Sequence, residues 1–292
     1  MTPGSKLFAL ALPVLAIGAL ALTAVRDGDP ARRPSPPAGE GSTPVAVVEL
    51  FTSQGCASCP PADRLLSKLA QDPLYGGKVI PLSFHVDYWN YIGWQDPFSS
   101  ALWSARQKLY AARAFHSNRI FTPQMVVNGR AECVGSNEGE VLERVRGALA
   151  EAPAARVALR LDPLTPEGQL RVRASARLLR DAEKGANGTK PELELWVAVY
   201  ESGLTTEVKA GENFKRVLRN DRVVRRFEKV LSLPGKAGST KEGEVLLGID
   251  KRWKTAELGV AAFLQDPSTL TIYGAAGAAG VPPRAQPATL NR

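Results

Sequence analysis

One stretch near the start of the globular part of the chain decides the fold, and it reads Val48-Glu49-Leu50-Phe51-Thr52-Ser53-Gln54-Gly55-Cys56-Ala57-Ser58-Cys59-Pro60-Pro61-Ala62-Asp63. Its first residues are apolar and β-branched, as is typical of a strand that is buried on both faces. After the cysteines, apolar residues recur at helical spacing through residue 69. The stretch therefore predicts a strand over residues 45–51, a turn that carries two cysteines, and a helix.

The two cysteines stand where the predicted helix begins. Unpaired N–H groups and the helix dipole stabilise a thiolate at a helix N-terminus. The two-residue spacing lets the second thiol close a small disulfide ring with the first. We therefore predict a redox pair in which Cys56 attacks and Cys59 resolves the mixed disulfide. Two alternatives stay open: a structural disulfide, and half of a zinc or copper site that is completed by Cys133, His85 or His116.

Farther along, strand and helix patterns alternate up to about residue 152. Strands are expected over residues 79–86, 124–127 and 130–134, the last two joined by a hairpin turn at Asn128-Gly129. Asp96-Pro97 predicts the start of a helix, and Asn137 predicts the cap of another. The face that the first of these helices is expected to bury carries Leu102, Ala105, Leu109 and Ala112. The order β-α-β-α-β-β-α predicts an α/β domain over residues 44–152.

Four further residues of this domain are candidates for the site. Thr122-Pro123 enters the third strand beside the N-terminus of the first helix, so we predict a cis proline whose neighbours' backbone groups bind an extended substrate segment. His85 and Asp87 share one strand face if the second strand continues, which would let them assist proton transfer to Cys59. A structural hydrogen bond is the alternative role for His85. Cys133 is either a third redox thiol, a metal ligand or a buried core residue.

From about residue 154 the apolar period changes to two. Apolar and polar residues alternate over 157–161, 170–178 and 193–199, and more strand-like runs follow up to residue 273. Such strands, each with one polar face, predict a mainly antiparallel, sandwich-like β domain over residues 153–274. Residues 275–292 are rich in Ala, Gly and Pro without periodicity, which predicts a disordered tail.

The N-terminal residues have the pattern of an export signal. Lys6 precedes a 19-residue apolar run over residues 7–25, so residues 1–25 are either a signal peptide or an uncleaved membrane anchor. Residues 26–43 are crowded with Pro, Gly and Asp and predict a flexible linker. We therefore expect the protein to be periplasmic or secreted, or anchored to the inner membrane by residues 7–25, in a compartment where disulfides persist.

The charge is unevenly distributed. The chain has 292 residues and a net charge of +8, yet residues 45–151 hold 10 acidic and 10 basic residues. The segment Lys209–Lys229 holds 8 basic and 3 acidic residues. Because no aromatic-rich strand motif or helix-turn-helix accompanies these charges, we expect no nucleic-acid partner. The segment is instead predicted to be a solvated face or a contact with an anionic envelope surface or a partner protein.

Several longer motifs of the chain stand out together. They are the opening stretch, His85–Asn90, Tyr91–Pro97, Thr122-Pro123-Gln124, Asn128-Gly129 and Asp221–Arg225. These motifs resemble a family of secreted bacterial proteins known as domain of unknown function 1223, to which a thioredoxin-like fold is assigned. The resemblance implies a thioredoxin-like fold for the predicted α/β domain, with Cys56 and Cys59 as the redox pair and Pro123 as its cis proline. It implies redox competence but no particular substrate.

The function expected from these features is that of an exported thiol–disulfide oxidoreductase that acts on protein or small-molecule thiols and disulfides without a metal or another cofactor. Two other classes remain open. One is a non-catalytic envelope binding module in which the disulfide is structural. The other is a copper metallochaperone that uses Cys56 and Cys59 together with Cys133 or a histidine.

Overall fold

The computed structural model describes residues 43–185 and 188–283. Within them, three α-helices are present: α1 (Cys59–Gln71), α2 (Ala101–Leu109), which continues into a π-helical turn over Tyr110–Ala114, and α3 (Glu138–Ala150). The strands of the same residues are β1 (Ala46–Thr52), β2 (Val79–His85), β3 (Gln124–Val127), β4 (Ala131–Val134), β5 (Ala155–Leu161), β6 (Gln169–Leu178), β7 (Glu192–Glu201), β8 (Leu204–Glu207), β9 (Val217–Asn220), β10 (Val223–Pro234), β11 (Thr240–Gly248), β12 (Leu258–Gln265) and β13 (Ile272–Ala279).

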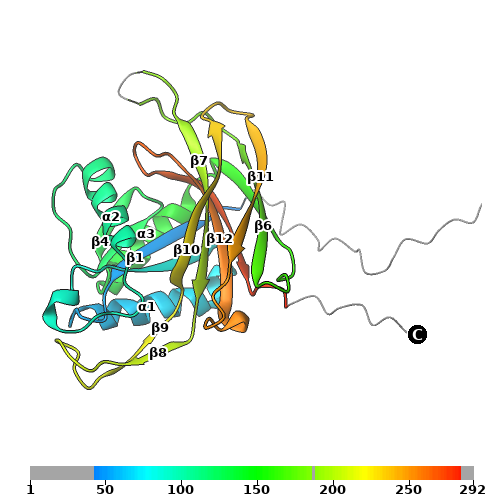
Figure 1. Ribbon diagram of the computed structural model, residues 1–292. Coiled ribbons are helices and arrows are strands. Elements are labelled where there is room, and N and C mark those ends of the chain that lie inside the picture. The colour runs from blue at the N-terminus through cyan, green and yellow to red at the C-terminus, as the bar shows by residue number, and fades with distance from the viewer. Residues whose placement is uncertain (1–42, 186–187, 284–292) are drawn as a thin grey trace, which may run out of the picture. The chain divides into compact units, whose positions relative to one another are not determined.

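One mixed sheet of eight strands organises the fold, in the order β13-β12-β7-β10-β2-β1-β3-β4 (Figure 1). Strands β1 and β2 are parallel, whereas β3 and β4 run antiparallel to their neighbours. Strand β10 lies in the middle of the sheet and joins its two halves. It pairs in parallel with β2 at Val223 and Ser83, and antiparallel with β7 along most of its length. Strands from both halves of the sequence therefore form one sheet.

The predicted fold class is wrong. From the sequence we expected a thioredoxin-like α/β domain followed by a mainly antiparallel, sandwich-like β domain. The structure is instead mostly β, with few helices, and β2 is not an edge strand because β10 continues the sheet beyond it. The elements expected before residue 152 occur in the expected order, but they share their sheet with β7, β10, β12 and β13.

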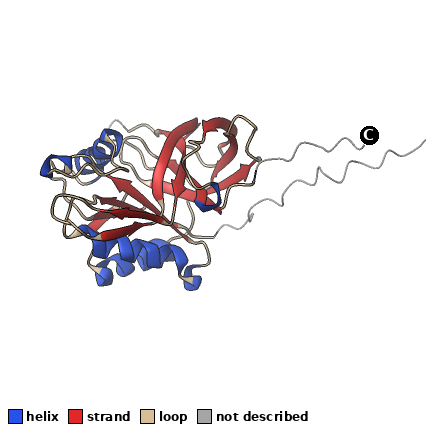
Figure 2. Cartoon of the chain, turned by 60° about the horizontal axis from the view of Figure 1, so that its bottom comes forward, coloured by secondary structure: helices blue, strands red, loops and turns tan. Residues whose placement is uncertain are grey.

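Helices cover both faces of the sheet where β1, β2 and β3 lie (Figure 2). Alternate residues of β1 point to opposite faces. Val48 and Leu50 pack with α1 and α3 in one core cluster, whereas Val47 and Phe51 pack with Trp103 and residues of β7, β10 and β12 in another. The central strands are accordingly buried on both faces, which explains the continuous apolar run that the opening stretch displays.

A buried ion pair ties α2 to the sheet in the second cluster. The guanidinium of Arg106 donates to both carboxylate oxygens of Glu49 on β1, at 2.6 and 2.9 Å, and to Gln265 on β12 at 3.2 Å. The Tyr110 hydroxyl also donates to Glu49. Burial lowers the pKa of Arg106, but the charge of Glu49 outweighs this and holds the pKa above its usual value. The pair is thus charged and satisfied by hydrogen bonds, as buried charges require.

A second sheet of three strands, in the order β11-β6-β5, packs over the β7, β12 and β13 part of the large sheet. Inward-facing Leu170, Val172 and Leu178 of β6 contact the inward residues of β7 and β12 in one apolar cluster. The period of two that the sequence shows over residues 157–178 arises from this half-buried packing. A third, two-stranded sheet pairs β8 with β9, which lies beside α1 in Figure 1.

Three smaller predictions are corrected by the structure. Helix α2 is capped by Ser100, whose hydroxyl accepts the N–H of Leu102, and not by Asp96. Its buried face holds Trp103, Ser104, Arg106 and Gln107, while Leu102 is 69% exposed and Leu109 is 39% exposed. Residues 275–279, expected in a disordered tail, pair with β12 as part of β13. The cap at Asn137 is confirmed, since its side chain accepts the N–H of Glu140.

The predicted signal peptide or anchor over residues 1–25 lies outside the described residues, as do all but the last residue of the predicted linker and residues 284–292 of the predicted tail. In residues 43–185 and 188–283, no helix is long and apolar enough to cross a membrane.

Candidate functional site

The two cysteines lie at the junction of β1 and α1, as the opening stretch predicted. They form a disulfide with a Cα–Cα distance of 5.4 Å. Cys59 is the first residue of α1, after Ser58 at the N-cap position, and prolines occupy the next helical positions, where an N–H group would have no partner in the helix. Both cysteines are buried, with Cys56 1% and Cys59 0% exposed, whereas Ala57 and Ser58 between them are exposed.

The Thr122–Pro123 peptide bond is cis and lies beside the disulfide. The Sγ atom of Cys56 is 3.9 Å from the carbonyl oxygen of Thr122 and 3.3 Å from the hydroxyl of Ser58. The indole N–H of Trp89 donates to the Thr122 hydroxyl at 2.7 Å. The structure therefore brings Thr122 and Pro123 to the cysteines, which is the arrangement expected from the sequence.

A loop from the C-terminal half of the chain holds the turn that carries the cysteines. We call residues 208–216, between β8 and β9, the clamp loop. Asn213 of this loop is 0% exposed, and its amide donates to the backbone oxygens of Gln54 at 2.8 Å and Cys56 at 2.9 Å. The carboxylate of Glu212 accepts the backbone N–H of Ala57 at 2.9 Å. The clamp loop thus supplies a hydrogen-bond partner to three backbone groups of the turn, one of which, the Cys56 oxygen, also accepts the Cys59 N–H at 3.2 Å.

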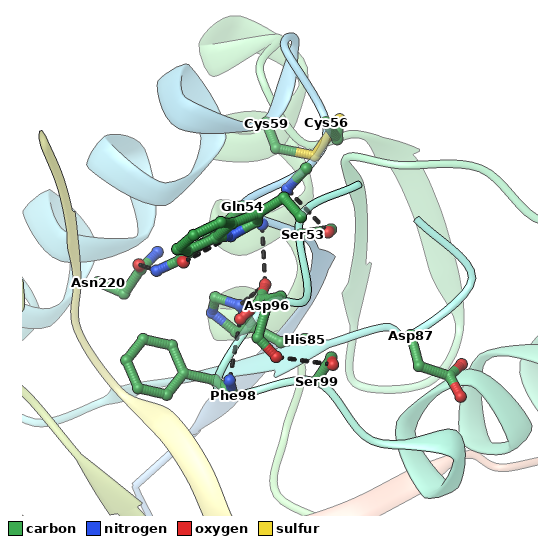
Figure 3. A network of polar contacts seen from close by, with 12 residues as sticks. Ser53, Gln54, Cys56, Cys59, His85, Asp87, Asp96, Phe98, Ser99 and Asn220 are labelled. Atoms are coloured by element: carbon green, nitrogen blue, oxygen red, sulfur yellow. Dashed lines mark hydrogen bonds and ion pairs between the residues drawn. A yellow bond between two sulfur atoms is a disulfide. The ribbon is translucent and has the colours of Figure 1, made fainter. Parts of the chain in front are cut away.

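His85 and Asp96 form a buried pair next to the same turn (Figure 3). Nδ1 of His85, at the end of β2, lies 2.7 Å from Oδ2 of Asp96, and both side chains are 0% exposed. The same Asp96 oxygen accepts the backbone N–H of Gln54 at 2.8 Å. Burial lowers the pKa of His85, but the charge of Asp96 outweighs it, so this pKa is raised. Burial likewise raises the pKa of Asp96, but the charge of His85 lowers it below its usual value.

Asp63 is a third buried titratable group of this region. It stands four residues after Cys59 on α1, which places both side chains on one side of the helix. Burial raises its pKa to about 6, although the charge of His85 opposes this. Within the described residues, Oδ1 of Asp63 and Nε2 of His85 are buried side-chain atoms without a hydrogen-bond partner. A carboxyl group in such surroundings gains and loses its proton near neutral pH.

Asp87 and Cys133 are not brought into this arrangement. Asp87 accepts a hydrogen bond from the Ser104 hydroxyl on α2 and lies apart from the His85–Asp96 pair in Figure 3. Cys133 is a buried free thiol in the core cluster under α1 and α3. Burial raises the pKa of the Cys133 thiol to about 11, so it is protonated at neutral pH. In residues 43–185 and 188–283, no three or more His, Cys, Asp or Glu side chains are grouped as a metal ion would require.

Four residues of the site were not predicted from the sequence. Asp96 was interpreted as a helix cap, although its position near His85 in an aromatic-rich loop was visible. Asp63 could have been noted from its spacing to Cys59 and its place on the apolar face of the helix. Glu212 and Asn213 carried no sequence signal, because more than 150 residues separate them from the cysteines that they hold.

The basic segment Lys209–Lys229 is not a single exposed patch. It runs through the clamp loop, β9 and the start of β10. The guanidinium of Arg222 lies over the Tyr200 ring at 4.6 Å, and that of Arg225 lies 3.5 Å from Glu201 and over the Trp253 ring at 5.1 Å. Part of its charge is therefore used within the molecule, and an anionic partner for the rest stays a prediction.

Comparisons with known proteins agree with this architecture. A crystal structure of protein AGR_C_4864 from Agrobacterium tumefaciens is 26% identical, with a TM-score of 0.59, and the match covers 85% of this chain and 99% of that one. HBP35 of Porphyromonas gingivalis is 16% identical, with a TM-score of 0.55, over 86% of this chain and 81% of that one, and this likeness concerns the fold alone. No curated protein matches the chain. The family model described as "Protein of unknown function (DUF1223)" matches residues 47–265, the span that contains every residue of the site, and the chain therefore belongs to the DUF1223 family.

Proposed function

We propose that the protein is a thiol–disulfide oxidoreductase that works outside the cytoplasm through Cys56 and Cys59. The observation that carries the proposal is the disulfide at the first turn of α1, with the Thr122 carbonyl 3.9 Å from Cys56 Sγ. Membership of the DUF1223 family is compatible with a redox role. The export signal predicted from residues 1–25 supports a compartment in which such a disulfide persists.

Reduction of a substrate disulfide begins with the dithiol form of the Cys56–Cys59 pair. The Cys56 thiolate attacks a substrate disulfide, forms a mixed disulfide and releases one substrate thiolate. The Cys59 thiol then gives its proton to the Asp63 carboxylate and attacks Cys56 Sγ, which restores the protein disulfide and releases the second substrate thiolate. Two electrons pass from the protein dithiol to the substrate. Asp63 suits the role of proton acceptor because its pKa of about 6 leaves it ionised, but only weakly acidic, at neutral pH.

Access is a requirement of this mechanism. Cys56 is 1% exposed in the oxidised protein. When the pair is reduced again, the thiolate that attacks the Cys56–Cys59 disulfide therefore reaches the Cys56 sulfur only when a covering segment moves. The exposed residues Ala57 and Ser58 and the clamp loop, which is attached to Cys56 and Ala57 by hydrogen bonds, are the segments next to it. Loops that open locally at low free energy are common at binding sites.

A turnover assay tests the proposal. The protein should reduce insulin or oxidise a model dithiol at a rate that Cys56→Ser abolishes, whereas Cys59→Ser should accumulate a mixed disulfide at Cys56. Cys133→Ser is the matched control and should retain turnover, because that thiol is buried in the core cluster under α1 and α3 and is not part of the disulfide. Equal turnover by the wild type and by both variants of the pair contradicts the proposal.

The burial of the pair favours a second candidate, a binding module in which the disulfide is structural. Buried disulfides held by surrounding hydrogen bonds resist reduction, whereas strained or exposed ones are labile. In that case, Cys56→Ser and Cys59→Ser would both lower the free energy of unfolding by about 2–4 kcal/mol, and the wild type would show no turnover.

A further inference from the structure

Glu212 of the clamp loop reaches across to the redox pair. Its carboxylate Oε2 accepts the backbone N–H of Ala57 at 2.9 Å. Ala57 directly follows Cys56 and directly precedes Ser58 at the N-cap position of α1. An exposed carboxylate from the C-terminal half of the chain therefore accepts a hydrogen bond from the backbone N–H of the residue that follows the attacking cysteine.

The clamp loop fixes the position of this carboxylate. Asn213, the next residue, is 0% exposed and attached to the backbone of Gln54 and Cys56 by two hydrogen bonds. The guanidinium of Arg216 donates to the Asn213 oxygen at 2.7 Å. The N–H of Phe214 donates to the oxygen of Gly211 at 3.1 Å, which closes a turn around Glu212. The contact of Glu212 with Ala57 is thus built by the loop and is not the chance contact of a free side chain.

The charge of Glu212 opposes the ionisation of Cys56. N–H groups and the dipole at the start of α1 favour a Cys56 thiolate. A carboxylate that accepts the Ala57 N–H occupies one of these donors and places a negative charge at the residue next to Cys56. Like charges disfavour the ionised form of a group, here the Cys56 thiolate. A less stable thiolate makes the reduced protein less stable, so the disulfide becomes a weaker oxidant.

We propose that Glu212 lowers the reduction potential of the Cys56–Cys59 pair, because its carboxylate accepts the Ala57 N–H. A residue from the C-terminal half of the chain would thereby tune the potential of the site. The inference rests on the proposed function, because the pair must exchange with thiols. The reaction concerned is the reduction of the disulfide by two glutathione thiols. It yields the Cys56 thiolate, the Cys59 thiol, one glutathione disulfide and one proton.

Other charged groups of this region include the buried groups Asp63, His85 and Asp96 and the guanidinium of Arg216 in the clamp loop. Glu212→Gln changes none of them and keeps a side-chain oxygen that can accept the Ala57 N–H. The variant therefore removes the charge and keeps the hydrogen bond. Glu207→Gln is the matched control, since Glu207 is an exposed acid on β8 in the same hairpin.

The equilibrium between the full-length protein and glutathione redox buffers tests the inference, with the reduced fraction read by thiol alkylation and mass spectrometry. Dithiothreitol buffers replace glutathione if the pair is too reducing for it. At about 10 mM salt we expect Glu212→Gln to favour the reduced form by roughly 3- to 10-fold, equivalent to roughly 15–30 mV at 29.6 mV per tenfold change. At about 1 M salt, where the Debye length is about 3 Å, the difference should fall below about 2-fold. Glu207→Gln should match the wild type at both salt concentrations.

Two results overturn the inference. One is a Glu212→Gln equilibrium that equals the wild type or shifts toward the oxidised form at low salt. The other is a shift that persists at 1 M salt, which would indicate a change of structure and not of charge. These equilibria require no substrate turnover, so a protein that turns over no substrate contradicts the proposed function and leaves this inference to its own measurement.

Discussion

The buried amide of Asn213 donates a hydrogen bond to the backbone oxygen of Cys56, 157 residues earlier in the chain. With its second bond, to the oxygen of Gln54, it attaches the clamp loop to the turn between β1 and α1. Residues after 152 therefore contribute to both structures that carry the cysteines. Strand β10 extends the sheet beside β2, and the clamp loop binds the turn between β1 and α1.

Asn213→Ala should destabilise the protein and loosen the turn that carries the pair. The Gln54 oxygen loses its donor and the Cys56 oxygen keeps only the Cys59 N–H, and leaving a buried polar group unsatisfied costs about 1–3 kcal/mol. Urea unfolding measures this cost, and the rate of disulfide reduction by dithiothreitol should increase because Cys56 becomes more accessible. Asn118→Ala, at an exposed position, should change the free energy of unfolding by less than about 0.5 kcal/mol. Equal effects of the two variants would show that the clamp loop does not hold the turn.

The titration of Asp63 should lower the free energy of unfolding as the pH rises from about 4 to about 6. Its pKa is raised from 3.8 to about 6 by burial, so the folded state binds a proton that the unfolded state has already lost within this range. The loss amounts to about 3 kcal/mol above pH 6. Asp63→Asn removes the titration, and it should therefore be more stable than the wild type at pH 7 and equal to it near pH 4, as measured by urea unfolding.

The same substitution should slow the exchange reaction at neutral pH. Wild-type turnover is expected to increase between pH 5 and 7 as Asp63 ionises, and Asp63→Asn should lose this increase. A variant that is less stable at pH 7, or that keeps the wild-type pH profile of turnover, would contradict the role given to Asp63.

Asp96, and not Asp87, should control the titration of His85. The pair with Asp96 raises the pKa of His85 against the effect of burial, so Asp96→Asn should lower that pKa below its ordinary value of about 6.5. Asp87→Asn should leave it unchanged, since Asp87 bonds Ser104. Proton NMR of the imidazole signals measures both, and His116, the only other histidine of the chain, is the internal reference. A larger shift in Asp87→Asn would contradict the pairing seen in the structure.

Arg106→Met should be strongly destabilising, because it leaves the Glu49 carboxylate buried without its partner. Removing one member of a buried ion pair costs about 3–5 kcal/mol. The double variant Glu49→Gln/Arg106→Met should regain part of this loss, and Lys108→Met, on the exposed face of α2, should have little effect. Urea unfolding of the wild type, of Glu49→Gln, of Arg106→Met and of the double variant gives the coupling energy of the pair, and additive losses would contradict it.

The sequence predicted the local structure around the cysteines because that information is local. The apolar run, the two cysteines and the helical spacing over residues 45–69 are sufficient to predict β1, the turn and α1. The cis peptide bond at Thr122–Pro123 followed from the expected order of strands. These features required no knowledge of the C-terminal half.

The strand pairing of the C-terminal half could not be read in the same way. Strand β10 has irregularities between Val224 and Arg226 and between Lys229 and Leu231. Such bulges interrupt the alternation of apolar and polar residues, so its first part was interpreted as a basic segment. Without β10 in the predicted sheet, the two halves appeared to be separate domains. Asp96 was missed for a related reason, because Asp-Pro is also the ordinary start of a helix.

The reduction potential of the wild-type Cys56–Cys59 pair shows whether this disulfide can exchange with thiols under cellular conditions, as the proposed function requires. A pair that exchanges with thiols in a cell is expected between about −270 and −120 mV, the range of known thiol–disulfide oxidoreductases. Equilibration with glutathione and dithiothreitol buffers, read by alkylation of the released thiols, gives the value. We expect the Cys56–Cys59 pair to have a potential within that range. A value below about −300 mV, as structural disulfides have, would contradict the proposed redox function.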